Sequence, residues 1–381
     1  MSAFARLRDA PETPLVDSEG YLPTYDNSLD EIEENGPCNG APMPFQPESS
    51  TSSLIVSQFN QRRFKYIPRA TNRIEGKNYV LFALKCHEFI VIKGQALLTV
   101  VQGAVTINEA ADILAGNRKY PIIATQSQAL PMITAIDSTE AAISSDGMEE
   151  FSQFQDQEFV TFLRLDNYSS GIETISSYYP PLKRFIYRSD LEDQMGQTYL
   201  DQALSRSNKY TFDLELNEPG LWIDKLWTEL MMKIVQETGS EYTFPEPHIT
   251  MVVGNKNSGK STFTKTLLNY YQELIYIDLD PGQLEFSPPH CLSLCKISDI
   301  IIGMGVKEPE KSVYYGFNTP QANPTLYIKC IEELLRHYML QMRPQGHSLI
   351  VNTPGWIKGF GKVLLEQITA LLHPDTLVVL G

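Results

Sequence analysis

The stretch that decides the fold is Ile249-Thr250-Met251-Val252-Val253, followed directly by Gly254-Asn255-Lys256-Asn257-Ser258-Gly259-Lys260-Ser261-Thr262. The first five residues form a continuous apolar run, which is typical of a strand buried on both faces of a parallel sheet. The residues after it satisfy the pattern G-x-x-x-x-G-K-[ST]. Because such a loop turns its backbone N–H groups inward on a phosphate, the stretch predicts a nucleotide-binding P-loop.

The residues that follow this loop supply the structural context that the motif needs. A helix is expected through Leu267 to Tyr271, with its positive dipole end at the phosphates. A second buried strand, residues 274–278, ends in Asp278-Leu279-Asp280-Pro281-Gly282-Gln283, which puts carboxylates at the carboxyl end of a strand. Strand, loop, helix and strand together predict an α/β P-loop domain with a parallel sheet.

The pattern also assigns contacts with a nucleotide. Lys260 can reach the β- and γ-phosphates of ATP, and Ser261 supplies a hydroxyl to Mg²⁺. Asp278 and Asp280 are expected where the metal ion and the attacking group meet. The residues expected to bind the cofactor are Gly254, Asn255, Lys256, Asn257, Ser258, Gly259, Lys260, Ser261 and Thr262.

Composition limits the classes of function that fit this chain. Its 381 residues carry a formal charge of -15, so phosphates would be repelled by most of the surface and any nucleic-acid site must be local. The five cysteines form no CxxC pair, which favours a reduced intracellular compartment. No signal sequence is apparent, nor an apolar run near the roughly 20 residues of a membrane span, so we expect a soluble protein without a membrane partner.

Changes in composition along the chain predict four regions. Residues 1–60, rich in Pro, Ser, Asp and Glu, indicate a disordered acidic tail, either a docking segment or a solubilising extension. Residues 61–145 alternate short apolar runs with glycines and predict an all-β, sandwich-like domain. Residues 146–245 are interpreted as the remainder of the N-terminal region and a linker. Residues 246–381 form the P-loop domain.

Two shorter segments of the third region carry local predictions. A strand is expected over residues 159–163, and the apolar spacing from Leu221 toward Val235 predicts a helix. Trp222 and Trp227 are expected to be core residues of this helix rather than recognition aromatics.

A third buried strand, residues 349–352, leads into the turn Thr353-Pro354-Gly355-Trp356. This turn should lie near the phosphate loop, where Trp356 could stack on a ring close to the γ-phosphate. Lys358 and Lys362 follow among glycines, so stacking and positive charge are combined as in single-strand binding sites. A core tryptophan is the alternative. No N-K-x-D guanine-reading element is present, which disfavours a GTPase.

Four segments together resemble one known family, the polynucleotide 5′-hydroxyl kinases of RNA processing. They are GNKNSGKST at 254–262, DLDPGQ at 278–283, YYGFNTP at 314–320 and NTPGWIKGFG at 352–361. Within this family the match is best to the fungal pre-ribosomal RNA processing kinase. The messenger-RNA 3′-end relative has Cys-Gly-Trp where this chain has Pro354-Gly355-Trp356. The resemblance covers residues 249–381 and implies a kinase domain behind a β-sandwich.

The resemblance implies a role for each matching residue. Lys260 would stabilise the transferring phosphate, and Asp280 would take the proton from, or orient, the RNA 5′-hydroxyl. Asp278 is the alternative for that role or a Mg²⁺ ligand, and Gln283 would order the metal's waters. The terminal nucleotide would be held by Thr353, Pro354, Gly355 and Trp356, with Lys358 as an added substrate contact.

The resemblance further implies a partner and a cellular place. A HEPN-type endoribonuclease would cleave the second internal transcribed spacer and leave the 5′-hydroxyl RNA end that this kinase phosphorylates, in a higher-order complex of the nucleus and nucleolus. The family's arginine lid and C-terminal module are not visible, so the kinase domain is expected to be incomplete after Gly381. An ATP-binding scaffold without phosphotransfer is the alternative. A dimerising metal-delivery ATPase is disfavoured because Asn255 stands where that class needs lysine.

Overall fold

The computed structural model describes residues 63–137, 158–172, 210–217, 220–237, 247–271, 273–305 and 307–381, together with a few isolated residues between these ranges. All of these residues belong to one unit, Arg62–Gly381. The predicted acidic tail, residues 1–60, lies outside the described residues.

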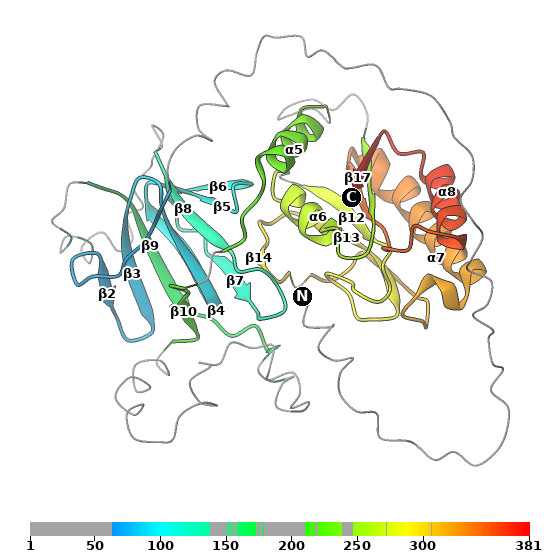
Figure 1. The fold of residues 1–381 in the computed structure, drawn as a ribbon. Coiled ribbons are helices and arrows are strands. Elements are labelled where there is room, and N and C mark those ends of the chain that lie inside the picture. The colour runs from blue at the N-terminus through cyan, green and yellow to red at the C-terminus, as the bar shows by residue number, and fades with distance from the viewer. Residues whose placement is uncertain are drawn as a thin grey trace, which may run out of the picture. The chain divides into compact units, whose positions relative to one another are not determined.

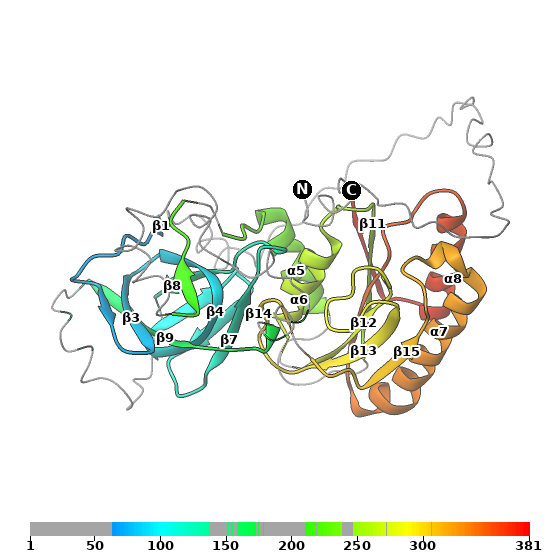
Figure 2. The same ribbon diagram turned by 90° about the horizontal axis from the view of Figure 1, so that it is seen from below.

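The amino-terminal part of this unit is built from β-strands that curl around a common core (Figures 1 and 2). Among the described residues the sheet has 11 strands, in the order β2-β3-β9-β4-β8-β5-β6, with β1, β7 and β10 also paired to β4. These strands are β1 (Phe64–Lys65), β2 (Arg73–Glu75), β3 (Tyr79–Lys85), β4 (Glu88–Gln102), β5 (Ala104–Ile107), β6 (Ala111–Leu114), β7 (Tyr120–Ala124), β8 (Met132–Ile136), β9 (Phe159–Asn167) and β10 (Phe212–Leu214). The eleventh strand, β14, comes from the P-loop part of the chain.

The long strand β4 holds this sheet together because it bonds to neighbours along its whole length. Its first half pairs with β8 and β10, and its second half pairs with β7 and β9. Gly94 allows the change of partner: its φ is 89°, and a Cβ there would lie 3.0 Å from Phe212 Cα. The strand β9 contains the predicted strand at 159–163 and belongs to this sheet.

The predicted helix of residues 221–235 forms as α5 (Lys225–Glu237). Trp222 precedes the helix and is 65% exposed, so the prediction that it is a core residue is wrong. Its ring instead lies 5.1 Å from the Arg63 guanidinium. Trp227 does pack inward, edge-on against Phe263 with ring centroids 5.3 Å apart.

The carboxyl-terminal part is an α/β domain whose 6-stranded sheet has the order β15-β13-β12-β16-β11-β17. Its strands, and the short β14, are β11 (Ile249–Gly254), β12 (Leu274–Asp278), β13 (Cys291–Ile297), β14 (Ile302–Gly303), β15 (Lys311–Tyr314), β16 (Leu349–Asn352) and β17 (Thr376–Leu380). The strands β12, β16, β11 and β17 are parallel, as predicted. The strand β13 is antiparallel to both of its neighbours, β12 and β15, and it follows β12 through a loop rather than a crossover helix.

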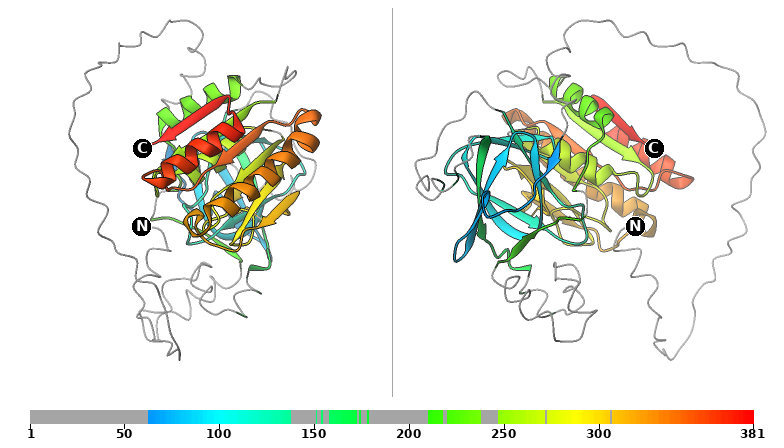
Figure 3. Two further views of the ribbon diagram at one scale, coloured as in Figure 1. Left: turned by 90° about the vertical axis from the view of Figure 1, so that its right-hand side faces the viewer. Right: turned by 60° about the vertical axis from the view of Figure 1, so that its left-hand side comes forward.

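Helices cover both faces of this sheet (Figures 1 and 3). The helices α5 and α6 (Lys260–Leu268) pack on one face, and α7 (Pro324–His337) and α8 (Phe360–Leu372) pack on the other. The short elements η3 (Pro320–Ala322), η4 (Tyr338–Met342, π-helical) and η5 (Arg343–Gln345) flank α7. The start of α7 is well defined, since the Asn323 side chain accepts a hydrogen bond from Leu326 N and Pro324 opens the first turn.

The two parts of the unit share a strand. The segment Ile302–Gly303 leaves the α/β domain as β14 and pairs in parallel with β7, where Ile302 lies opposite Ile122. No helix within the described ranges is long and apolar enough to cross a membrane.

Candidate functional site

The phosphate loop lies between a buried strand and an uncapped helix. Every residue of β11 is buried, and the loop after it enters α6 through Gly259, which has a φ of 89°. No side chain caps the amino terminus of α6, so its first N–H groups are available to an anion. A Cβ on Gly259 would lie 2.7 Å from Trp227 Cη2, so glycine is required both by the backbone and by the packing.

Lys260 lies within this loop. Its side chain is buried, and Nζ donates hydrogen bonds to the carbonyls of Gly254 (3.0 Å) and Asn255 (2.8 Å). Burial lowers the pKa of Lys260, while the nearby Asp280 carboxylate opposes this shift. The structure therefore holds the ammonium group at the loop whose amides would contact phosphate.

The other loop residues differ in exposure. Ser261 is exposed at the first turn of α6, and Thr262 is half-buried. Ser258 Oγ is buried and has no hydrogen-bond partner among the described residues. The exposed side chains at the tip of the loop are Asn255, Lys256 and Asn257.

Asp278 is a buried carboxyl group at the end of β12. Its Oδ1 accepts from Asp280 N (3.2 Å) and Asn352 Nδ2 (3.2 Å), and its Oδ2 accepts from Glu285 N (3.0 Å) and Tyr276 Oη (3.3 Å). Burial nevertheless raises the pKa of Asp278 to about 7. Both of its carboxylate oxygens accept hydrogen bonds from neighbouring protein groups, so Asp278 supports the site from the protein interior.

Asp280 is the carboxylate that faces the phosphate loop. It is only partly buried, and its Oδ1 accepts one hydrogen bond, from Gly282 N (3.2 Å). Burial raises the pKa of Asp280, whereas Gly282 N and the charges of Lys260 and Lys256 lower it. The charges of both lysines therefore act on the Asp280 carboxylate.

Two residues that support the aspartates escaped the interpretation of the sequence. Asn352, at the end of β16, donates to Asp278, and its own Oδ1 is buried without a partner among the described residues. The sequence feature that could have identified Asn352 is an amide side chain at the end of an otherwise apolar strand. Tyr327 on α7 donates from Oη to Leu279 O at 2.5 Å. No local pattern pointed to Tyr327, because that contact joins residues 48 positions apart.

The turn after β16 meets the phosphate loop through its backbone. A Cβ on Gly355 would lie 2.7 Å from Lys256 Cα, so the two loops are in direct contact. Thr353 is fully buried, and its hydroxyl donates to Val252 O at 2.8 Å. Its side chain therefore joins β16 to β11 rather than facing the surface.

The remaining predicted substrate residues lie on either side of this turn. Trp356 is partly buried, packs against the core beneath α7 and α8, and has its ring 6.0 Å from that of Phe360. Pro354 is buried, whereas Lys358 and Gln283 are exposed. No contact in the described residues joins Gln283 or Lys358 side chains to the phosphate loop.

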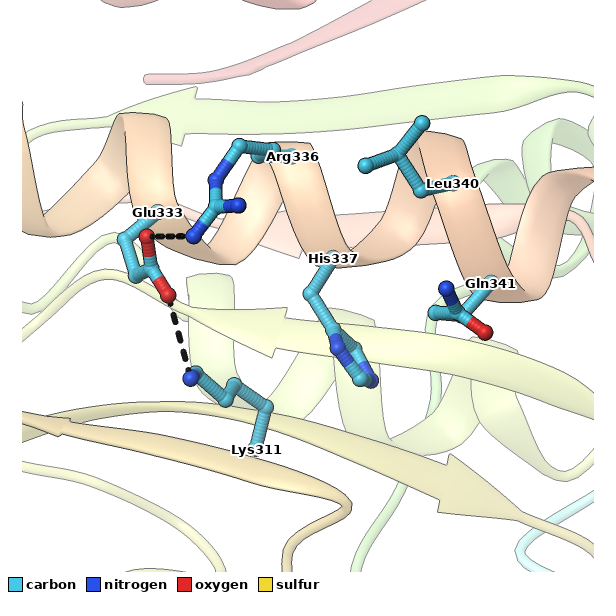
Figure 4. Close-up of a pocket in the computed structure, with 6 residues that line it drawn as sticks. All are labelled: Lys311, Glu333, Arg336, His337, Leu340 and Gln341. Carbon is cyan, nitrogen blue, oxygen red and sulfur yellow. Dashed lines mark hydrogen bonds and ion pairs between the residues drawn. The ribbon is translucent and has the colours of Figure 1, made fainter.

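A shallow pocket elsewhere on the α/β domain shares no residue with this site (Figure 4). It is lined by Lys311, Glu333, Arg336, His337, Leu340 and Gln341 and encloses about 130 Å³. Glu333 pairs with both Lys311 and Arg336 there, so each of these two cations already has an anionic partner.

Comparison with known proteins places this site in a family. Residues 254–381 match the family described as mRNA cleavage and polyadenylation factor CLP1 P-loop. The polynucleotide 5′-hydroxyl-kinase GRC3 of Debaryomyces hansenii is 36% identical over 95% of this chain and 55% of its own length. Along most of its length the chain is similar to the polynucleotide 5′-hydroxyl kinases. The GRC3 kinase of Candida albicans is 33% identical over 93% of this chain and 50% of its own length.

This chain spans about half the length of these polynucleotide kinases. The kinase NOL9 of Danio rerio is 27% identical over 80% of this chain and 45% of its own length. Among solved structures, that of wild-type Clp1p with Pcf11p (454–563) aligns with a TM-score of 0.45 and 16% identity, over 80% of this chain and 61% of that chain.

Proposed function

We propose that this chain is the nucleotide-binding part of an ATP-dependent kinase that phosphorylates the 5′-hydroxyl end of RNA. The observation that carries the proposal is the direct contact of the Gly355 turn with the phosphate loop, with the Asp280 carboxylate near enough for the charges of Lys260 and Lys256 to lower its pKa. A phosphate grip, a carboxylate for the attacking hydroxyl and an aromatic turn are the parts that such a transfer requires.

The residues at the site suit ATP. The uncapped start of α6 offers N–H groups to the phosphates, and Lys260 offers a positive charge. The buried Ser258 Oγ and Asn352 Oδ1 lack partners among the described residues, as expected of atoms that bind a ligand or its water. The described residues contain no cluster of three or more His, Cys, Asp or Glu side chains placed for a metal, so Mg²⁺ would be held mainly by the phosphates and Ser261.

Each side chain then has a distinct task. Bound ATP supplies the transferable γ-phosphoryl group, and Mg²⁺ offsets the charge on its oxygens. Lys260 would leave the loop carbonyls and neutralise the phosphates, and Asp280 would orient the RNA 5′-hydroxyl and accept its proton. Asp278 would hold Asp280 in place through the hydrogen bond to Asp280 N. A strong base is not needed, because positioning dominates this reaction.

The RNA end would lie on the turn 353–358. Trp356 would stack on the terminal base, and Lys358 would contact the strand. The charge of -15 makes such a local patch necessary, since the rest of the surface repels phosphate. Gln283, exposed after Asp280, would order water on the metal. The alternative that the chain is an ATP-binding scaffold makes no use of Asp280.

The biological setting is proposed from the resemblance of the four sequence segments to the pre-ribosomal RNA processing kinases. We infer that the substrate is the 5′-hydroxyl end left by cleavage of pre-ribosomal RNA in the second internal transcribed spacer. The supplier of that end would be a HEPN-type endoribonuclease bound to the full-length protein, in the nucleolus of the cell.

Transfer of label from γ-labelled ATP to a 5′-hydroxyl oligoribonucleotide tests the function, with the full-length protein and its nuclease partner present. We expect transfer by the wild type and none by Lys260→Ala or Asp280→Asn. The control is Lys296→Ala, which removes a partly exposed lysine paired with Glu273 at 2.9 Å. ATP binding by the wild type without any transfer would support the scaffold and refute the kinase.

A further inference from the structure

Three polar side chains from separate segments meet beside α6. Lys265 Nζ lies 2.7 Å from Gln128 Oε1 and 3.2 Å from Glu285 Oε1, and Gln128 Nε2 lies 3.5 Å from the same Glu285 oxygen. The side chains of Lys265 and Glu285 are only 16% and 12% exposed. We call these three residues the 128–265–285 cluster.

The cluster joins three parts of the molecule that the chain keeps apart. Gln128 lies in the turn between β7 and β8 of the first sheet, 137 positions from Lys265. Lys265 follows Lys260 by five residues on the same helix, α6. Glu285 lies in the loop between β12 and β13, which contains neither helix nor strand.

Glu285 connects this cluster directly to the aspartates of the site. Its backbone N donates to Asp278 Oδ2 at 3.0 Å, while its side chain is held by Lys265. The next residue, Phe286, is buried edge-on against Tyr276 with centroids 5.4 Å apart. The loop after Asp280 is therefore anchored at residues 285 and 286, and its polar anchor is on the helix that carries Lys260.

In this arrangement one rigid helix, α6, contacts both the phosphate-binding side of the site and the loop that follows Asp280. The start of α6 presents Lys260 to the phosphates, and the next turn presents Lys265 to the loop that follows Asp280. Because an α-helix is stiff over five residues, the cluster sets the distance between the phosphate grip and the carboxylates. A displacement of about 1 Å in such a site costs roughly a hundredfold in rate.

We propose that the 128–265–285 cluster is a positioning device for phosphoryl transfer, through which the first sheet helps to place Asp278 and Asp280. The proposal rests on the proposed function. None of the three residues needs to touch ATP or RNA, so their loss should affect the rate of transfer more than nucleotide binding. Loss of an exposed ion pair would change neither the rate of transfer nor nucleotide binding, because exposed pairs contribute little free energy.

The first test compares steady-state kinetics of Lys265→Met, Glu285→Gln and Lys265→Arg in the full-length protein with its nuclease partner. We expect Lys265→Met and Glu285→Gln to lower kcat about tenfold or more, with KM for ATP changed less than about twofold. Lys265→Arg should restore most of kcat because it retains the charge. The double variant should be no worse than either single variant, as expected of groups that act as a unit.

The second test is hydrogen exchange of residues 279–289, which needs no activity. Lys265→Met should speed exchange there, and the control Lys296→Met should not, because its ion pair with Glu273 is exposed. If the wild type transfers no phosphate but exchange rises in Lys265→Met, the proposed function fails, and only the anchoring of residues 279–289 by the cluster is supported. If the wild type is active and Lys265→Met changes neither kcat nor exchange, the positioning device is refuted. Additive effects in the double variant would also refute it.

Discussion

Gly355 is the residue at which the two loops of the site touch. A Cβ at this position would lie 2.7 Å from Lys256 Cα and 2.8 Å from Lys256 N, distances that force one backbone to move. The φ of Gly355 is not in the left-handed region, so space alone excludes a side chain. The close approach of the phosphate loop to this turn therefore depends on the absence of a side chain at Gly355.

Gly355→Ala should weaken ATP binding by about tenfold, since the phosphate loop must shift by a few tenths of an ångström or more. Isothermal titration calorimetry with ATP measures this. The control is Gly116→Ala, whose Cβ has nothing within 4 Å. Equal affinities for both variants would show that the two loops move apart without consequence.

Asp278 should make stability depend on pH near neutrality. Its pKa is about 7 in the folded chain and 3.8 ordinarily, because burial disfavours the carboxylate. Between these values the folded state binds the proton more tightly than the unfolded state, so the free energy of unfolding falls as the pH rises from about 4 to about 7. The contribution is complete at low pH and lost above about pH 7.

Asp278→Asn removes this titration, so its cost in stability should be larger at about pH 5 than at about pH 8. Thermal unfolding of both proteins without nucleotide, across this range, gives the difference. The control is Asp299→Asn, whose carboxylate is partly exposed and has a lowered pKa. A cost of Asp278→Asn that rises with pH would contradict the assignment.

At the scale of elements, the side chain of Asn269 holds the carboxyl end of α6 in place. The Asn269 amide donates to Ile301 O at 2.9 Å and accepts from Ile301 N at 2.8 Å, both in buried surroundings. Asn269 thereby ties the helix to the segment that leads into β14. Tyr270, the next residue, donates to Glu109 O at 3.0 Å.

Asn269→Ala should lower the free energy of unfolding by about 2–4 kcal/mol, because two buried backbone groups of Ile301 lose their partner. Urea titration followed by circular dichroism measures the change. Gln367→Ala, at an exposed position of α8, serves as the control and should stay within about 0.5 kcal/mol. A loss that small for Asn269→Ala would mean that water replaces the amide.

At the scale of the whole molecule, the pairing of β14 with β7 joins the two parts of the unit through residues that are far apart in the sequence. Met304 N also donates to Ile123 O at 2.7 Å, just beyond the paired residues. Gly303 makes the approach possible, since its φ is 82° and a Cβ there would collide with the carbonyl of Ile123.

Gly303→Ala should destabilise the protein more than Gly346→Ala does. Both glycines have left-handed φ values, which cost alanine about 1 kcal/mol, but a Cβ on Gly346 meets nothing within 4 Å. The difference between the variants thus isolates the contact with β7. Hydrogen exchange of residues 120–124 should quicken in Gly303→Ala alone. Identical melting and exchange in the two variants would show that β14 contributes nothing to stability.

Several parts of the fold and site were predictable because their signals are local. The buried β11, the phosphate loop and α6 follow from one continuous stretch, and the strand end at Asp278 follows from the next. Trp222 was predicted wrongly because helical spacing was assumed to begin before Lys225. The strand β13 was missed because no crossover helix separates it from β12, to which it is antiparallel. The strand β15, which pairs with β13, was missed as well.

The sequence by itself determined the phosphate-loop motif between Gly254 and Ser261, because the motif consists of consecutive residues that include one lysine. Only the tertiary structure decided the environment of each side chain. It buried Thr353 against Val252, raised the pKa of Asp278, and joined Lys265 to Gln128 and Glu285. The physical reason is that burial and ion pairing depend on residues far apart in the chain, which no local pattern records.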